Sequence, residues 1–258
     1  MSHPVFDLSS RTAVVIGGTS GIGRALALGL AQSGANVVAT GRREELARSA
    51  AKDIAALGRK SLAVACDVAS RASLQSLHDT VCREFDHVDI LINSAGTTKK
   101  TPTVDVSEDE WSQIFETNLT GMLRACQVFG RRMMERKYGR IINIASLASS
   151  RGFFQVAAYA ASKAGVVSLT KTLAVEWAKY GVCVNAIAPG VFRTDLNKAL
   201  LDGTPRGQEF LLRTPMGRFG NIDELVGAAI FLASDAASYV TGHVLAVDGG
   251  FLASGVNQ

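Results

Sequence analysis

The sequence lacks the features that would place the protein in a membrane or export it. It has no apolar run of about 18 residues, which is the length that a membrane-spanning helix needs. Residues 1–7 also lack the basic and then apolar pattern of a secretory signal peptide. We therefore expect a cytoplasmic protein that does not interact with membranes.

Cysteine is scarce and scattered along the chain. The four cysteines, Cys66, Cys82, Cys126 and Cys183, form no Cys-x-x-Cys pair and no cluster with histidine. This pattern is typical of reduced thiols, and it offers no set of metal ligands. The sequence therefore predicts no metal site.

The chain carries a net charge of +4 and has a pI of about 9.0, so nucleic acid has to be considered as a partner. Its basic residues are distributed, and the pairs at 131–132 and 136–137 fit the exposed face of one helix. Nucleic-acid binding calls for a concentrated basic surface. We therefore expect no nucleic-acid partner, and the positive charge favours an anionic small molecule instead.

Short β-branched runs alternate with longer helical patterns, which is typical of a parallel sheet covered on both faces. The sequence therefore predicts an α/β fold, a doubly wound parallel sheet of about seven strands with helices on both faces. Residues 1–258 would form a single Rossmann-type domain. The predicted strands are 12–16, 36–40, 61–65, 89–93, 140–144, 182–187 and 243–247, and the clearest helices are 23–32, 44–57, 108–136 and 156–179.

Two segments, residues 96–105 and residues 190–220, interrupt this alternation. Both follow the carboxyl end of a predicted strand, where open α/β sheets bind their ligands. Long excursions in a compact domain are often lids or binding loops. We interpret 190–220 as a substrate lid.

A glycine-rich turn joins the first predicted strand to the first predicted helix. Glycines permit a tight turn and close approach of the backbone to a pyrophosphate, whose charge the helix N-terminus attracts. The position of the turn directly after a strand favours a nucleotide site. Its candidate cofactor-binding residues are Gly17, Thr19, Ser20, Gly21, Ile22 and Gly23.

The end of the second strand distinguishes the two nicotinamide cofactors. An acidic residue there would bind the ribose 2′-hydroxyl of NAD, but the first acids, Glu44 and Glu45, come only in the next helix. Arg42 and Arg43 stand at the strand end instead, and an arginine can pair with a 2′-phosphate. We therefore favour NADP over NAD, the alternative being that both arginines are solvated residues at a helix start.

Two further strand ends carry candidate cofactor contacts. Asp67, followed by Val68, could accept a hydrogen bond from an adenine amino group, and its alternative role is to cap a helix. Asn93, Ala95 and Gly96 are small enough for the backbone to pass close to the cofactor. A tight turn at that point is compatible with the same role.

Tyr159 and Lys163 stand four residues apart, a spacing that puts both side chains on one face of a helix. A phenol with a pKa of about 10 is a weak acid or base at neutral pH, and a nearby ammonium lowers that pKa. Ser146 follows a predicted strand and offers a hydroxyl. The alternatives are a surface Tyr–Lys pair and a serine that caps a helix.

Asn118 falls within the long predicted helix that residues 107–110, Ser-Glu-Asp-Glu, open with the pattern of a capping box. The stretch 118–121 contains poor helix formers, which indicates a local kink. Such a kink could order a water for proton transfer. An exposed or back-bonding asparagine is the alternative.

The order of these motifs resembles that of the short-chain dehydrogenases/reductases over residues 9–250. Three residues depart from the usual pattern of that family. Ile16 replaces a threonine, Ser94 replaces an asparagine, and Ser20 stands where many NADP-dependent members have a basic residue. The motifs that carry the resemblance are the glycine turn, Asn93-Ser94-Ala95-Gly96, Asn118, Ser146, Tyr159-x-x-x-Lys163 and Pro189-Gly190-x-x-x-Thr194.

The resemblance implies an enzyme that interconverts a secondary alcohol and a ketone, and it implies a homotetramer built on the two long helices and the C-terminal segment. Tyr159 would be the acid–base group, and Ser146 would bond to the substrate oxygen. Lys163 would lower the pKa of the tyrosine, bind the ribose hydroxyls and pass protons through a water held by Asn118. The residues that would lie around the nicotinamide are Tyr159, Lys163, Pro189, Gly190, Val191 and Thr194.

Segments 191–195 and 213–220 resemble the gluconate 5-dehydrogenase branch, which implies a sugar acid or polyol as substrate. The alternatives are a 3-oxoacyl-carrier-protein reductase, a general carbonyl reductase and an NADP(H)-binding regulator without turnover. Residues that could reach the substrate are Leu147, Arg151, Phe153, Phe154 and Gln155. Candidate anion-binding residues are Lys99, Lys100, Arg151, Arg193, Arg206 and Arg213, each with solvated surface charge as its alternative.

Overall fold

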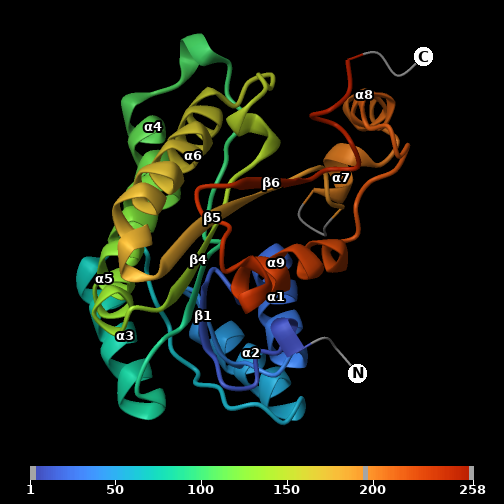
Figure 1. Cartoon of the computed structure of the whole chain (residues 1–258). Coiled ribbons are helices and arrows are strands. Elements are labelled where there is room, and N and C mark those ends of the chain that lie inside the picture. The colour runs from blue at the N-terminus through green and yellow to red at the C-terminus, as the bar shows by residue number, and fades with distance from the viewer. Residues whose placement is uncertain (1–3, 194–196, 256–258) are drawn as a thin grey trace.

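A parallel sheet with the strand order β2-β1-β3-β4-β5-β6 forms the centre of the molecule (Figure 1). The computed structural model describes residues 4–193 and 197–255. Its strands are β1 (Thr12–Ile16), β2 (Asn36–Thr40), β3 (Ile90–Asn93), β4 (Gly139–Ile144), β5 (Val182–Pro189) and β6 (Val244–Val247). The predicted doubly wound α/β sheet is confirmed, with six strands in the described residues rather than about seven.

The predicted strand at 61–65 is wrong. Only Ala65 forms an isolated bridge, to Gly41, so the segment does not extend the sheet beyond β2. The hydroxyl of Thr40 donates to the carbonyl of Val64 at 2.6 Å, where a strand would have received a backbone N–H. The segment therefore lies beside the edge strand without a continuous ladder of hydrogen bonds.

The long helices are α1 (Gly21–Gln32), α2 (Glu44–Ala56), α3 (Arg71–Phe85), α4 (Glu108–Phe115), α5 (Gly121–Arg136) and α6 (Ala157–Trp177), followed by α7 (Lys198–Leu201), α8 (Pro205–Arg213) and α9 (Val226–Ala233). None of the helices in the described part of the chain combines the length and apolarity needed to span a membrane. Short 3₁₀ turns lie at Pro4–Phe6, Thr103–Asp105, Leu147–Ser149, Ala178–Tyr180, Ile222–Leu225 and Asp235–Ala237.

Helices cover both faces of the sheet because successive strand residues point to opposite sides. In β1, Ala13 and Val15 belong to a core cluster with residues of α1, α2 and α9. Val14 and Ile16 belong to a second cluster with residues of α3, α5 and α6. Figure 1 shows these two groups of helices on opposite sides of the sheet.

The strand register aligns the carboxyl ends of the central strands. Ile16 at the end of β1 lies opposite Thr40 of β2 on one side and Asn93 of β3 on the other. Asn93 in turn lies opposite Asn143 of β4. The strand order reverses between β1 and β3, which is where doubly wound sheets open a crevice for ligands. The loops after these strands therefore meet at one edge.

The long helix predicted at 108–136 is divided by a π-helical turn, Glu116–Thr120, between α4 and α5. Ser107 caps α4 by accepting a hydrogen bond from the backbone nitrogen of Glu110. The reciprocal half of the predicted capping box is absent, because the Glu110 carboxylate accepts a bond from the Lys99 ammonium at 2.7 Å. A charged donor makes a stronger hydrogen bond than a backbone amide does.

The excursion at 190–220 is closed at its base by two backbone hydrogen bonds. Gly220 donates to the carbonyl of Val191, and Arg193 donates to the carbonyl of Gly220. Between these contacts lie α7 and α8, the second of which begins with Thr204 as N-cap and Pro205 in the first turn. Residues 194–196 lie outside the described part of the chain.

A buried polar chain ties the sheet to α6. The amide nitrogen of Asn93 donates to the side-chain oxygen of Asn143 at 2.9 Å. The amide nitrogen of Asn143 donates in turn to the hydroxyl of Thr170, also at 2.9 Å. Thr170 donates in turn to the carbonyl of Val166 within α6. All these side chains are buried, so the bonds fix the position of α6 on β3 and β4.

We expect Thr170→Val to lower the free energy of unfolding by about 1–3 kcal/mol, because it leaves the buried amide of Asn143 without an acceptor. Urea denaturation measures the change. Thr172→Val is the matched control, because Thr172 also bonds to a carbonyl four residues back but is exposed. Equal losses in the two variants would show that the buried chain is not important for stability.

Candidate active site

The glycine turn lies directly against the end of β3. Gly17 has a φ of +78°, and a Cβ there would come within 2.5 Å of the backbone nitrogen of Ala95. A Cβ at Gly23 would likewise collide with the carbonyl of Gly17. Both positions require glycine, since a side chain would push the turn away from its neighbours. The turn and residues 94–96 thus form one continuous backbone surface.

The N-terminus of α1 is open at this surface. Ser20 is the N-cap, but its side chain makes no capping hydrogen bond. Gly21 has a φ of +51°, and a Cβ there would meet no heavy atom of the described residues within 4 Å. Ile22 follows in the first turn of the helix. Uncapped backbone N–H groups at a helix N-terminus bind phosphate well.

Arg42 and Arg43 follow β2 at the same edge, and both are exposed. Arg43 is the N-cap of α2, but its side chain makes no capping bond. The backbone passes close to the glycine turn here, because a Cβ at Gly41 would lie 2.8 Å from the hydroxyl of Thr19. Two guanidinium groups with available donors therefore stand beside the turn.

Asp67 is exposed, and one of its carboxylate oxygens accepts a bond from the backbone nitrogen of Ala69 at 3.0 Å. Its predicted alternative, a helix cap, is wrong. Ser70 caps α3 instead, by accepting a bond from the nitrogen of Ser73. Val68 is buried and packs against Gly121 at the start of α5. The second carboxylate oxygen of Asp67 makes no hydrogen bond within the described residues.

Asn93 differs from the other candidates for cofactor binding. Its side chain points into the core, where it meets Asn143 and the thiol of Cys126. It therefore reaches the sheet edge only through its backbone. Gly96 lies at that edge, and a Cβ on it would be 3.4 Å from Oδ1 of Asn118 and 3.6 Å from Nζ of Lys163.

Asn118 lies in the π-helical turn and is fully buried. Its Oδ1 accepts a bond from the backbone nitrogen of Thr97 at 2.8 Å, and its Nδ2 donates to the carbonyl of Thr97 and to Ser162. The helix is interrupted at the predicted place by this π-helical turn, and the alternative of an exposed asparagine is wrong. Because the amide is almost fully used, it holds the 96–105 excursion against α6.

Ser146 and Tyr159 approach each other at the end of β4. Ser146 caps the 3₁₀ turn Leu147–Ser149, accepting a bond from Ala148, while Ser149 accepts one from the nitrogen of Ser146. The capping alternative for Ser146 is therefore correct as a structural role, but it does not exclude a catalytic one. The Ser146 hydroxyl also interacts with the phenol of Tyr159.

Lys163 is 4% exposed, and its Nζ donates to the carbonyl of Ile144 at 2.6 Å. The same nitrogen lies 5.8 Å from the centre of the Tyr159 ring. Burial lowers the pKa of Lys163 to about 8, so the group remains mostly protonated at neutral pH. A surface Tyr–Lys pair, the alternative considered from the sequence, is wrong.

The pKa of Tyr159 differs from the expectation. Burial of the phenol raises its pKa above the ordinary value of 10, while the hydrogen bond with Ser146 acts in the opposite direction. Lys163 is not a cause of this shift, because its ammonium bonds to Ile144 rather than to the phenol oxygen. The predicted lowering of the pKa of Tyr159 by Lys163 is therefore not seen in this arrangement.

The end of β5 completes the edge. Pro189 pairs with Val247, and a Cβ at Gly190 would lie 2.6 Å from the Cα of Asp248. Val191 follows at the closed base of the 190–220 excursion. The remaining candidate on this segment, Thr194, lies outside the described residues.

Two contributors were missed in the sequence. Ser162 is fully buried, accepts the bond from Asn118 and donates to the carbonyl of Tyr159 at 2.7 Å. Thr97 contributes both of its backbone polar groups to Asn118. A serine beside Lys163 on the inner face of a predicted helix was an available signal for the first. The contribution of Thr97 comes from its backbone, which the identity of the side chain does not reveal in a sequence.

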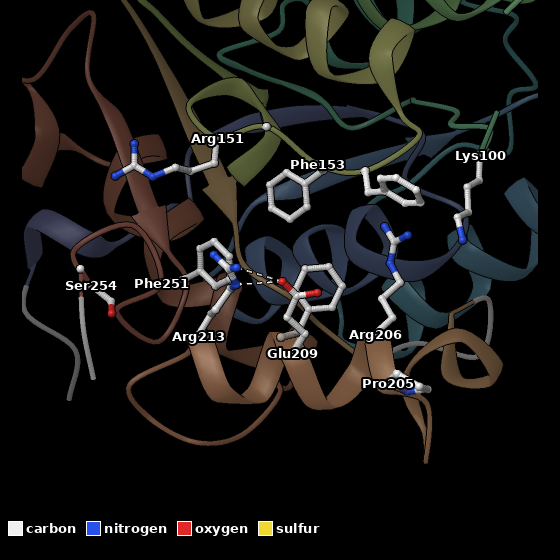
Figure 2. A pocket seen from close by; sticks show the side chains of 13 residues that line it. Lys100, Arg151, Phe153, Pro205, Arg206, Glu209, Arg213, Phe251 and Ser254 are labelled. Atoms are coloured by element: carbon white, nitrogen blue, oxygen red, sulfur yellow. Dashed lines mark hydrogen bonds and ion pairs between the residues drawn. The ribbon is translucent and has the colours of Figure 1, made fainter. Parts of the chain in front are cut away.

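A pocket of 520 Å³ lies at the segment that follows the 3₁₀ turn Leu147–Ser149 along the chain (Figure 2). Its walls come from residues 151–154, from α8 and from residues 251–255. Phe153, Phe210 and Phe251 lie with their ring centres between 5.8 and 6.4 Å apart. Of the predicted substrate contacts, Arg151, Phe153 and Phe154 line this pocket. Leu147 is buried, and Gln155 joins the 96–105 excursion through its carbonyl.

A protein-family model described as enoyl-(acyl carrier protein) reductase matches residues 17–252, which is most of the chain. The chain belongs to the short-chain dehydrogenases/reductases. The resemblance seen in the motifs is thereby confirmed. As a member of this family, it is a nicotinamide-dependent oxidoreductase that acts on alcohol groups.

The names of similar proteins include dehydrogenases of sugar acids and of a polyol. The D-threitol dehydrogenase of Mycolicibacterium smegmatis is 42% identical over 246 residues, covering 95% of this chain and 94% of the relative. The 2-dehydro-3-deoxy-D-gluconate 5-dehydrogenase of Pseudoalteromonas atlantica is 40% identical over 248 residues, covering 96% and 98%. A structure of gluconate 5-dehydrogenase from Burkholderia cenocepacia, in complex with NADP and tartrate, has a TM-score of 0.94 and 39% identity, covering 97% and 98%.

We expect Ser146→Ala to move the pH dependence of alcohol oxidation to higher pH. The role expected for Tyr159 in oxidation is that of the base. Ser146 lowers the pKa of this phenol, so removal of the serine hydroxyl raises that pKa. The measurement is kcat/KM against pH. Ser149→Ala breaks the other half of the same cap and is the control. A rising limb that stays in place in Ser146→Ala, or moves equally in both, would contradict the assignment.

Proposed function

We propose that this short-chain dehydrogenase/reductase uses NADP(H) to interconvert a secondary alcohol and a ketone on a sugar acid or polyol. One observation carries the proposal. Tyr159, Ser146 and Lys163 come together at the same edge of the sheet as the open N-terminus of α1. A proton donor and a dinucleotide-binding backbone thus belong to one site.

The residues along this edge of the sheet fit the successive parts of a dinucleotide. Gly17, Thr19, Ser20, Gly21, Ile22 and Gly23 would hold the pyrophosphate on backbone N–H groups. Asp67 and Val68 would contact the adenine, and the backbone at 93–96 and 189–191 would lie along the nicotinamide half. When bound, the nicotinamide ring supplies a hydride to the carbonyl carbon or accepts one from the alcohol carbon.

The preference for NADP rests on Arg42 and Arg43. Both guanidinium groups are exposed beside the glycine turn, while the first acids after β2, Glu44 and Glu45, lie in α2. A planar guanidinium pairs well with a phosphate and gains nothing comparable from a 2′-hydroxyl. The similar Burkholderia enzyme was found in complex with NADP, which is consistent with this choice.

The chemistry of the chain's own residues is acid–base catalysis. In reduction, Tyr159 gives its proton to the carbonyl oxygen, and Ser146 donates a hydrogen bond to the same oxygen. Lys163 binds the ribose hydroxyls of the cofactor and returns a proton through a water near Asn118. Such positioned proton transfer contributes roughly 10²–10⁴-fold to the rate.

A sugar acid or polyol is supported by the three dehydrogenases described above, whose names give substrates of these two kinds. A second candidate is reduction of a 3-oxoacyl thioester. The three phenylalanines of the pocket favour it, since their rings would accept an acyl chain. A substrate screen with ketones, sugar acids and acetoacetyl thioesters distinguishes the two.

We also propose a cytoplasmic homotetramer. Val175 on α6 is 82% exposed, and Trp111 on α4 stacks on Phe115 at the surface while remaining 41% exposed. Large apolar side chains on adjacent helices are typical of a protein–protein interface. Sedimentation of the purified protein tests this assembly.

We expect Tyr159→Phe to reduce turnover at least about 100-fold while leaving the affinity for NADPH within about twofold, because only the ionisable oxygen is lost. Absorbance of the reduced nicotinamide follows turnover, and fluorescence titration follows binding. Full activity in this variant would exclude Tyr159 as the acid. Tight NADPH binding by the wild type without turnover of any substrate would favour a regulator instead.

We expect Arg42→Ala to weaken NADPH binding by about tenfold or more while leaving NADH binding nearly unchanged, because a charge-assisted bond to the 2′-phosphate is lost. Titration with each cofactor measures the two dissociation constants. Arg48→Ala is the control, since Arg48 is exposed on α2 and paired with Glu44. Equal weakening of NADPH and NADH would mean that Arg42 is only a solvated residue.

A further inference from the structure

The structure reduces the six candidate anion-binding residues to two. Four of them already have a hydrogen-bond or ion-pair partner within the protein. These pairs are Lys99 with Glu110, Arg193 with Asp202, Arg213 with Glu209, and Arg151 with the carbonyls of Ser150 and Leu252. Lys100 and Arg206 make no ion pair or hydrogen bond within the described residues, and both line the pocket.

Lys100 and Arg206 come from opposite walls of this pocket. Lys100 belongs to the 96–105 excursion, and Arg206 lies in the first turn of α8. Figure 2 shows their side chains extending toward one another. The carboxylate that also lines this pocket, Glu209, is paired with Arg213. The positive charges of Lys100 and Arg206 therefore repel each other, and an anion placed between them would be attracted by both.

The floor beside these cations is aromatic. The guanidinium of Arg206 lies 5.5 Å from the ring centre of Phe210, which holds it over the floor by a cation–π contact. Phe153 and Phe251 continue the floor away from Arg206. Such a surface accepts the C–H face of a carbon skeleton and offers no hydrogen bond to a hydroxyl group.

One wall of the pocket follows the candidate catalytic segment along the chain. Ser146 caps the 3₁₀ turn that leads directly to Arg151, the first residue of the pocket wall. On the other side, the backbone nitrogen of Thr101 donates to the carbonyl of Gln155 at 2.9 Å. This bond joins the excursion that carries Lys100 to the segment that enters α6 before Tyr159. Both the wall that carries Arg151 and the wall that carries Lys100 are thus connected through the backbone to the segments of Ser146 and Tyr159.

We propose that Lys100 and Arg206 form the binding site for the carboxylate of the substrate, so that the enzyme acts on sugar acids in preference to neutral polyols. The proposal rests on the proposed function and refines it. The carboxylate lies between the two cations, and the carbon chain runs over the aromatic floor toward Ser146 and Tyr159. The two cations then determine specificity without taking part in the proton transfer.

The test uses pairs of substrates that differ only in the acid group. These are the four-, five- and six-carbon aldonates, threonate, xylonate and gluconate, and the matching alditols, threitol, xylitol and glucitol. We expect the wild type with NADP⁺ to show a kcat/KM at least about tenfold higher for an acid than for its alditol. Lys100→Met and Arg206→Met should each lower kcat/KM for the acid by about tenfold and leave the alditol within about twofold.

Two controls separate charge from structure. Lys99→Met removes the neighbouring cation that is paired with Glu110, and it should leave the acid preference unchanged. Arg206→Lys keeps the charge and should retain part of the preference. Calorimetric titration of gluconate into the wild type and into the Lys100→Met/Arg206→Met double variant measures the site without turnover, and the double variant should bind at least about tenfold more weakly.

The possible outcomes separate a failure of the carboxylate site from a failure of the proposed oxidoreductase function. Turnover without a preference for acids, or a preference that survives in both single variants, would overturn the carboxylate site while leaving the oxidoreductase activity intact. Absence of turnover for every pair would overturn the proposed substrate class. In that case equal binding of gluconate by the wild type and the double variant would also overturn the carboxylate site.

Discussion

The arrangement of the site depends on the buried ammonium of Lys163. α6 carries it to the end of β4, where it bonds to the carbonyl of Ile144 at 2.6 Å. Burial of a cation is unfavourable, as the lowered pKa of about 8 shows, so the helix that carries it must be held firmly. Two buried amides do this, Asn143 through Thr170 and Asn118 through Ser162. With α6 fixed in this way, Tyr159 is brought to Ser146.

Much of the fold, and the grouping of the candidate residues Ser146, Tyr159 and Lys163, could be predicted from the sequence, because they depend on local patterns. Apolar runs such as Val14-Val15-Ile16 are buried on both sides and became strands where predicted. The glycine turn also follows from local chemistry, since the positive φ at Gly17 and the close contact with Ala95 leave few other residues possible. The order of the motifs then indicated the family.

The rest depends on partners that are distant in the sequence. The segment 61–65 has the composition of a strand, but the Thr40 hydroxyl takes one of its carbonyls. Glu110 has the spacing of a capping box, but Lys99 offers it a stronger donor. The pocket floor joins Phe153, Phe210 and Phe251, whose separation along the chain hides the cluster from any reading of periodicity. The pKa of Tyr159 depends on burial, which spacing alone does not give.

The π-helical turn at Glu116–Thr120 has a consequence for how this protein can vary. Gly121 donates to the carbonyl of Glu116, five residues back, so the helix contains one residue more than a regular α-helix needs over that span. Deletion of one residue would allow α4 and α5 to run on as a single regular helix, but it would turn Asn118 away from Thr97 and Ser162. At these five positions, a regular helix and the hydrogen bonds of Asn118 thus cannot both be kept, so the stability of the helix and the geometry of the site oppose each other.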